Sequence, residues 1–417
     1  MGRRRAAAAA ASDLARLAVR CACVVACVAL TAGRARADGA GLSDDAILGP
    51  PRAQSAPSLR LASVTSRMTA FEQDGRGYQS QAGPALGPGS ERLTVFEPQI
   101  DAVLKHGDRF THRVFVPVDV ITAASPDAID RARRPPDVLS GASRHNEAGT
   151  VDWTATYRAD RATQTDVSLR NGLHLEEDFR SWHGGLAVSR AFADGATVVS
   201  ASALEVLDWF DRFDITGHRH GRTSRSSTTG GAGVTQILTP TTIVAASYGV
   251  TVQTGELGNT WNSVPLAASA RGPEILPPVR VRHAIVGKAS QALPWNGALR
   301  VHYRFYSDTW GIAAHSAEGM LLQRVAPFLY VGALLRVHRQ TGADFYTTFA
   351  GIPAARRTAD SDLAPLDSRT VGGKVVSDLP LDGPGPRLLH LEIGYERYSR
   401  SNDLWMNVLT CATGYVF

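Results

Sequence analysis

The feature that most constrains this chain is a strict alternation of apolar and polar residues in several short segments. In residues 299–306 (LRVHYRFY) every second residue is apolar or aromatic, and residues 151–158 (VDWTATYR) and 389–396 (LHLEIGYE) repeat the pattern. Successive side chains of a β-strand point to opposite faces, so each segment is predicted to be a strand with one apolar and one polar face. Soluble β-sandwiches and membrane β-barrels both contain such strands, so the alternation alone does not choose between them.

The lengths of the connections between strands separate these two classes. The alternation predicts about 16 strands, at residues 61–72, 91–104, 110–122, 149–158, 163–175, 182–191, 196–207, 227–239, 241–253, 279–292, 296–308, 313–325, 327–339, 367–379, 386–398 and 404–417. Counted along the chain, every even-numbered connection is short, and the long ones are all odd-numbered, at 73–90, 123–148, 208–226, 254–278 and 340–366. Outer-membrane barrels have short periplasmic turns at one rim and long extracellular loops at the other, which produces this segregation. We therefore predict an all-β fold over residues 61–417, a closed transmembrane antiparallel β-barrel of about 16 strands with short periplasmic turns and long extracellular loops.

The first 37 residues have the features of a secretory signal peptide. Three arginines at residues 3–5 are followed by an apolar run at 21–33 and by a small-residue cleavage site at 35–37 (ARA). The apolar run is shorter than the roughly 20 residues that a helix needs to cross a bilayer. We therefore expect residues 1–37 to be removed after export, and residues 38–60, which are rich in Pro, Ala and Ser, to form a flexible segment before the barrel.

Removal of the signal peptide changes what the charge of the chain implies. The full sequence has 44 basic and 39 acidic residues and a formal charge of +5. Seven of the arginines and one of the acids lie in residues 1–37, so the remaining chain carries a net charge of −1. Nucleic acid is not an expected partner, because its binding requires a persistent basic patch. Three of the four cysteines also lie in the signal, which leaves only Cys411 and excludes an intramolecular disulfide.

Two further features bear on the cellular location. No segment after the signal contains 18 consecutive apolar residues, so a helical membrane span is not expected. The last predicted strand ends on Phe417, with Tyr415, Leu409 and Trp405 on the same face. A terminal aromatic residue on an amphipathic strand resembles the signal that the barrel-assembly machinery recognises. We therefore expect this machinery and outer-membrane lipid as partners, and an outer-membrane location; nothing in the sequence indicates an oligomeric state.

Four segments carry a resemblance to a known family. They are residues 119–126 (DVITAASP), 137–143 (DVLSGAS), 302–312 (HYRFYSDTWGI) and 339–346 (RQTGADFY). The chain resembles an uncharacterised family of bacterial outer-membrane β-barrel proteins, known only as a domain of unknown function, from about residue 65 to its last residue. The resemblance implies the barrel fold and no particular activity, because none of these segments is a catalytic signature.

In a closed barrel the polar face of each strand lines the lumen, so its charged residues are the candidates for solute selection. These candidates are Arg280, Arg282, Arg300, His302, Arg304, Arg336, His338, Glu392 and Glu396. The first two arginines and the two at 300 and 304 lie on neighbouring strands, where they would form a basic stripe that selects anions. The alternative is that lumenal charges of both signs neutralise one another and only hydrate a polar interior.

The third connection is the most distinctive of the long ones. It contains Asp127, Arg131, Arg133 and Arg134. We hypothesise that this connection folds into the lumen as a constriction whose arginines select anions. An ordinary ordered surface loop is an equally good interpretation, since long loops are often but not always functional.

The sequence carries no enzyme signature. Residues 182–185 (WHGG) lack the strand and helix that flank a nucleotide-binding loop, and His315 and Ser316 are adjacent on one strand and point to opposite faces. We therefore expect no catalytic residue, cofactor or metal. The sequence favours a porin-like channel or transport component for small polar solutes. The alternative is a plugged, non-conducting barrel with a surface-binding or scaffold role in the envelope, its lumen filled by residues 123–148 or 38–60.

Overall fold

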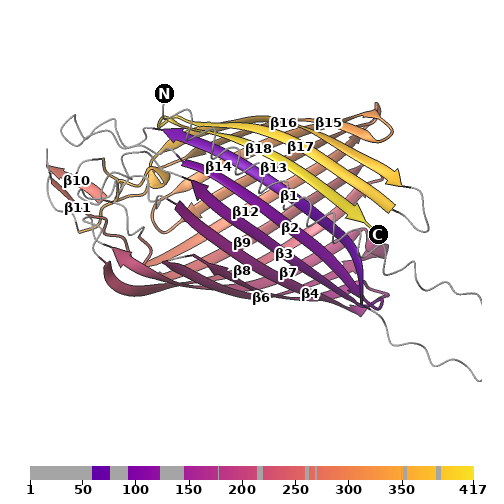
Figure 1. Cartoon of the computed structure of the whole chain (residues 1–417), viewed down its shortest axis with the longest axis horizontal. Coiled ribbons are helices and arrows are strands. Elements are labelled where there is room, and N and C mark those ends of the chain that lie inside the picture. Colours follow the sequence, from indigo (N-terminus) through magenta and orange to yellow (C-terminus); the bar gives the residue numbers. More distant parts are fainter. Residues whose placement is uncertain are drawn as a thin grey trace, which may run out of the picture. The chain divides into compact units, whose positions relative to one another are not determined.

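The computed structural model describes residues 59–75, 93–122, 145–176, 178–213, 219–258, 263–267, 270–348, 350, 355–381 and 387–417. Within these ranges, 16 antiparallel strands form a closed barrel in which neighbours along the chain pair and the first strand pairs with the last. Figure 1 shows the strands running side by side at a common inclination around the wall. Because the ladder closes on itself, the wall has no unpaired edge, and its backbone groups are hydrogen-bonded within the sheet.

The barrel strands are β1 (Leu59–Gly75), β2 (Leu93–His106), β3 (Phe110–Thr122), β4 (His145–Asp160), β5 (Thr165–Leu175), β6 (Phe179–Phe192), β7 (Thr197–Phe213), β8 (Arg219–Thr239), β9 (Thr242–Gly255), β12 (Val279–Leu293), β13 (Gly297–Asp308), β14 (Ala313–Ala326), β15 (Leu329–Gln340), β16 (Leu366–Leu381), β17 (Arg387–Arg400) and β18 (Leu404–Val416). A separate two-stranded sheet, β10 (Ser263–Ala267) and β11 (Ala270–Pro273), lies in the connection between β9 and β12. The described ranges also hold two single-turn 3-10 helices, η2 (Ala193–Gly195) and η3 (Ser361–Leu363). None of their helices is long and apolar enough to cross a bilayer.

The structure confirms the predicted closed barrel and its number of strands. β3 has the predicted bounds, and β1 begins at Leu59 rather than at residue 61. The prediction of a long connection at residues 208–226 was wrong. Most of these residues are in strands, because β7 continues to Phe213 and β8 begins at Arg219. The small sheet of β10 and β11 was not predicted, since its strands are too short to show an alternation.

The two faces of the barrel strands differ as the alternation predicts. On β13, Val301 and Tyr303 are each 45% exposed on the outer face, and Ile393 on β17 is 59% exposed there. Large apolar side chains left uncovered around the outside of a closed barrel are the exterior that contacts membrane hydrocarbon. One polar pair on this face joins the Tyr303 hydroxyl to Nδ1 of His315 at 2.6 Å.

The two rims of the barrel carry different connections. The connections after β2, β4, β6, β8, β12, β14 and β16 are all short and lie at one rim with the start of β1 and the end of β18; we call it the short-turn rim. Two of its turns contain Gly107 and Asn296, both with φ of 61°, a left-handed conformation that these residues adopt at little cost. The opposite rim, which we call the long-loop rim, carries all the long connections.

A compact apolar core lies at the long-loop rim. Trp310 and Ile312 from the β13–β14 connection are buried together with Ala343 and Leu363 from the β15–β16 connection, and Leu257 and Leu276 from the β9–β12 connection pack against them. A second cluster joins Val264 of β10 to Ala350 and Ala359. We call the described residues of these three connections (256–278, 309–312 and 341–365) the cap. Figure 1 shows β10 and β11 beyond the ends of the barrel strands.

Candidate functional site

Strand register places the predicted lumen residues on one face of the barrel wall. Arg282 of β12 lies opposite Asp308 of β13, and residues 304, 302 and 300 follow on the same face at two-residue steps. The register of the other strands puts the remaining candidates on this inner face too: Arg280 on β12, Arg336 and His338 on β15, and Glu392 and Glu396 on β17. The outer face of the same strands carries the exposed apolar side chains described above.

Several of these charges are neutralised by a neighbour on the inner face. Arg336 pairs with Glu318 at 2.7 Å, and Glu392 pairs with Lys374 at 3.1 Å. Further inner-face ion pairs join Arg113 to Asp101, Arg158 to Asp166, Arg170 to Asp152 and Arg225 to Asp208. Over this part of the wall, the arrangement is that of a polar interior in which opposite charges cancel.

Arg280 is buried beneath the cap. It pairs with Asp308 at 2.5 Å, and the two side chains are 8% and 0% exposed. Its guanidinium also lies 4.1 Å from the ring centre of Trp310, a cation–π contact. Arg280 therefore joins the barrel wall to the cap and presents little free charge to the lumen, so it does not belong with the basic residues described next.

Five cationic or titratable side chains on two adjacent strands form what we call the basic wall. They are Arg282 and Lys288 on β12 and Arg300, His302 and Arg304 on β13. None of the five makes an ion pair with a carboxylate among the residues that the structure describes; Asp308 lies opposite Arg282 but is bonded to Arg280. Arg300 and Arg304 are exposed on the inner face, and Arg304 also lies 5.5 Å from the ring centre of Tyr306. Through Arg300 and Arg304, the basic wall therefore presents a local surplus of positive charge to the lumen.

The strands that follow the basic wall around the barrel present small, uncharged residues. The inner face of β7, β8 and β9 carries Ser200, Ser202, Gly231, Gly233, Ser247 and Gly249 in one continuous set of paired positions. This small-residue wall joins the basic wall directly, because Ser247 lies opposite Val286 of β12. Small side chains leave room inside a barrel, so this part of the wall takes up little of the space beside the basic wall.

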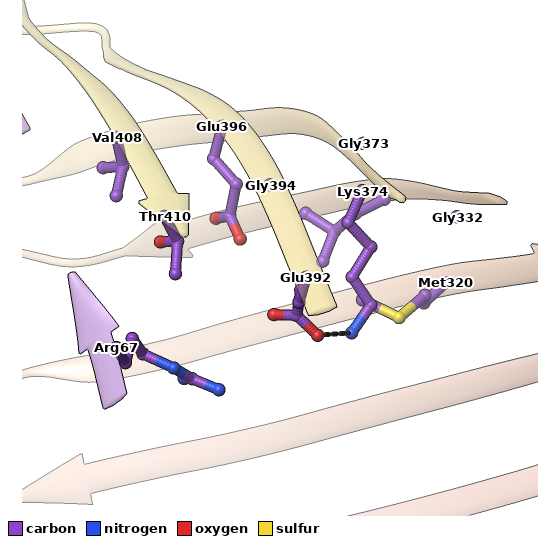
Figure 2. Close-up of a pocket in the computed structure, with 11 residues that line it drawn as sticks. Arg67, Met320, Gly332, Gly373, Lys374, Glu392, Gly394, Glu396, Val408 and Thr410 are labelled. Atoms are coloured by element: carbon purple, nitrogen blue, oxygen red, sulfur yellow. Dashed lines mark hydrogen bonds and ion pairs between the residues drawn. The ribbon is translucent and has the colours of Figure 1, made fainter. Parts of the chain in front are cut away.

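A hollow of about 170 Å³ lies on the inner face of β14 to β18 and β1. Figure 2 shows Arg67 reaching toward it from β1, with the Lys374–Glu392 ion pair on the other side. Glu396, Val408 and Thr410 complete that part of its lining. We call this cavity the lumenal hollow.

Sequence reasoning missed three charged residues of the basic wall and the lumenal hollow. Arg67 lies within the predicted strand 61–72, Lys288 within 279–292 and Lys374 within 367–379, and all three occupy inner positions of the observed strands. The alternation was sufficient to identify them.

Some predictions lie outside the described residues. They are the signal peptide (1–37), residues 38–58 of the flexible segment, and Asp127, Arg131, Arg133 and Arg134 of the constriction loop. Their roles stay predictions.

One hydroxyl–imidazole pair on the inner face resembles part of a catalytic triad. Ser316 Oγ lies 2.7 Å from Nδ1 of His338, whose Nε2 faces Oε1 of Gln340 at 3.2 Å. The pair lacks the carboxylate that stabilises a protonated imidazole in hydrolytic triads. No group of three or more metal-ligating side chains is found within the described ranges.

A family model described as "Protein of unknown function (DUF3570)" matches residues 186–407, which is more than half of the chain. The chain belongs to this family. The match confirms the predicted resemblance to an uncharacterised family. In this DUF3570 protein, the matched residues include the whole basic wall and all of the lumenal hollow except Arg67, Val408 and Thr410. No curated protein sequence matches the chain.

Solved barrels of the outer membrane resemble the chain at low identity. A BenF-like porin from Pseudomonas fluorescens Pf-5 is 9% identical with a TM-score of 0.43, over 85% of this chain and 99% of the porin. OccK9 (OpdG) from Pseudomonas aeruginosa is 13% identical with a TM-score of 0.40, over 85% and 97%. The siderophore receptor PirA from Acinetobacter baumannii is 8% identical with a TM-score of 0.40, over 81% of this chain and 53% of the receptor, so the chain spans about half of that receptor's length. None of these likenesses bears on what the chain binds.

Proposed function

We propose that this protein is a porin-like channel of the bacterial outer membrane that passes small polar solutes and prefers anions. The observation that carries the proposal is the basic wall, a row of lumenal cations on β12 and β13 without carboxylate partners in the described ranges. Charges of one sign on the wall of a narrow aqueous channel raise the local concentration of counter-ions and lower the barrier to their entry.

The rest of the lumen supports the same preference. Elsewhere the inner-face charges are mostly joined in ion pairs, such as Arg170 with Asp152 at 3.0 Å and Arg225 with Asp208 at 2.6 Å. Paired charges produce a field that falls off quickly, so the unpaired cations dominate the potential that a passing solute meets. The small-residue wall beside them provides space for the solute.

A plugged barrel with a surface-binding or scaffold role is the second candidate. The cap favours it, because the β9–β12, β13–β14 and β15–β16 connections share a buried apolar core at the long-loop rim, which is extracellular in an outer-membrane barrel. Conductance separates the two candidates.

The decisive experiment is a single-channel recording on the refolded mature protein, residues 38–417, in a planar bilayer. We expect stepwise currents with a reversal potential that shows a preference for anions. The double variant Arg300→Glu/Arg304→Glu is expected to reverse this preference. The matched control is Arg369→Glu, an exposed arginine on the outer face of β16, which should leave the preference unchanged. A folded barrel that gives no current steps would overturn the channel proposal and favour the plugged barrel.

A further inference from the structure

The lumenal hollow contains two opposite charges without ion-pair partners. Arg67 and Glu396 both line it, and neither makes an ion pair with any other described residue. They stand on either side of β18: Arg67 lies opposite Ala412, and Glu396 lies opposite Val408 four residues before it. Since they do not neutralise each other, a molecule in the hollow meets a positive group at one end and a negative group at the other.

The position of the Glu396 side chain requires a glycine at residue 372. A Cβ at Gly372 would lie 2.8 Å from Cγ of Glu396 and 2.8 Å from the carbonyl oxygen of Tyr395, so only glycine leaves this carboxylate its position on the wall. In Figure 2 the Glu396 carboxylate points from β17 toward the interior of the hollow. A half-buried carboxylate without a cationic partner is a favourable place for an ammonium group.

The remaining lining is neutral and partly apolar. Lys374 and Glu392 pair at 3.1 Å and cancel each other. Thr410 offers a hydroxyl between the two free charges, and Met320 and Leu334 form an apolar surface. Gly394 also lines the hollow, and a Cβ there would meet only ordinary contacts, at 3.6 Å from Cβ of Lys374 and 3.8 Å from the Gly373 carbonyl oxygen, so a larger side chain can be introduced at this position.

We infer that the lumenal hollow is a binding site for a small zwitterion of the amino-acid class with an aliphatic substituent. Arg67 receives the carboxylate, Glu396 receives the ammonium group, and the substituent lies on Met320 and Leu334. A simple anion would leave Glu396 unmatched, and a simple amine would leave Arg67 unmatched. The inference deepens the proposed function, because it names a class of solute that the channel would carry.

The test is equilibrium binding to the mature protein folded in detergent, so that it does not depend on conduction. Leucine is the zwitterionic probe; 4-methylpentanoate keeps its carboxylate and aliphatic part, and 3-methylbutylamine keeps its amine. We expect leucine to bind about tenfold more tightly than either, as the loss of one charged hydrogen-bonding group implies. A 4-methylpentanoate affinity equal to that of leucine would overturn the zwitterion site and indicate an anion site.

Two charge variants make the test specific. Arg67→Gln should weaken leucine and 4-methylpentanoate about tenfold and leave 3-methylbutylamine unchanged, and Glu396→Gln should weaken leucine and the amine and leave the acid unchanged. Arg304→Gln removes an unpaired inner-face cation of the basic wall and is expected to leave leucine binding unchanged. Equal effects of all three variants would overturn the assignment.

A steric variant tests the hollow without altering its charges. Gly394→Leu should abolish leucine binding by filling the cavity, whereas Gly249→Leu, which adds the same side chain to the small-residue wall, should not. Normal leucine binding by a folded Gly394→Leu protein would overturn the site. Leucine binding without current steps would refute the channel and support the binding site in the lumenal hollow. Current steps without leucine binding would support the channel and refute the binding site.

Discussion

Arg280 donates from both Nε and Nη2 to a single carboxylate oxygen of Asp308, at 2.9 and 2.5 Å. The Tyr306 hydroxyl donates to the same oxygen at 2.6 Å, and the backbone N–H groups of Trp310 and Ile312 donate to the other oxygen at 2.9 and 3.1 Å. Asp308 therefore fixes the turn that starts the cap and holds the cap to β12.

Asp308→Asn should loosen the cap while the barrel stays folded. Removing one partner of a buried ion pair costs about 3–5 kcal/mol, because the remaining charge is left uncompensated. We expect faster backbone hydrogen exchange across residues 309–312 and 341–348. The barrel itself should stay folded, as judged by gel electrophoresis of unheated and heated samples. Asp367→Asn is the control: Asp367 is 66% exposed and 3.6 Å from Arg339, and exposed pairs contribute about 0–1 kcal/mol. Equal exchange in the two variants would contradict the role of Asp308.

The cap should also lose stability at high pH through Tyr346. Burial raises the pKa of the Tyr346 hydroxyl above its ordinary value of 10.0, and the negative charge of Asp360 adds to the rise. The folded cap thus disfavours the phenolate, so this contribution to stability is complete below the unfolded pKa and is lost as the pH rises through the folded pKa. The difference in phenolate absorbance between wild type and Tyr346→Phe should show an ionisation above pH 10. An ionisation at the pH of a free tyrosine would refute this.

An added charge should destabilise the barrel more on its outer face than on its inner face. Ile393→Arg places a cation on the lipid-facing side of β17 and should destabilise the barrel by about 2–4 kcal/mol if the position lies near the bilayer midplane. Val376→Arg, on the inner face opposite Glu392, should cost far less. Equilibrium unfolding by urea in phospholipid vesicles measures both. Equal losses would mean that the two faces do not meet different environments.

Phe417 offers a test of assembly that is separate from stability. The Phe417 N–H donates to the Ala62 carbonyl at 3.0 Å, and its ring packs edge-on against Tyr415 at 4.6 Å between centroids. Phe417→Ala should lower the stability of refolded protein by about 0.5–1.5 kcal/mol, the range for one aromatic pair. If the assembly machinery reads this residue, the folded fraction in cells should fall much further. A cellular loss no larger than the loss in vitro would refute recognition of Phe417.

The wall of the barrel was predictable from the sequence because a membrane imposes one apolar face on every strand. That constraint does not apply beyond the bilayer, and there the predicted strand ends were wrong. Asp208 and Asp211 extend β7 with ion pairs to Arg225 and Arg219 of β8, at 2.6 Å each, and neither face of this extension needs to be apolar. The alternation stops although the hydrogen-bonded ladder continues.

The face of each lumenal residue was also predictable, whereas its partner was not. Arg280 and Arg300 look alike in the sequence, yet Arg280 is paired with Asp308 and Arg300 is unpaired within the described ranges. Pairing depends on register between strands and on how the cap folds over their ends, and no local pattern encodes either. For the same reason, charged residues of the lumen could be predicted from the sequence, but their meeting in the lumenal hollow could not.

The contrast between the basic wall and the small-residue wall has a consequence for any solute with a dipole moment. Positive charge lies along β12 and β13, and the strands that follow, β9, β8 and β7, carry no charge on the six inner positions described above. The electric field in this part of the barrel is therefore directed from the charged strands toward the adjacent uncharged ones. In the proposed channel, a dipolar molecule would be turned as it travels, with its negative end toward β13. The wall would thus act on the orientation of its cargo as well as on its charge.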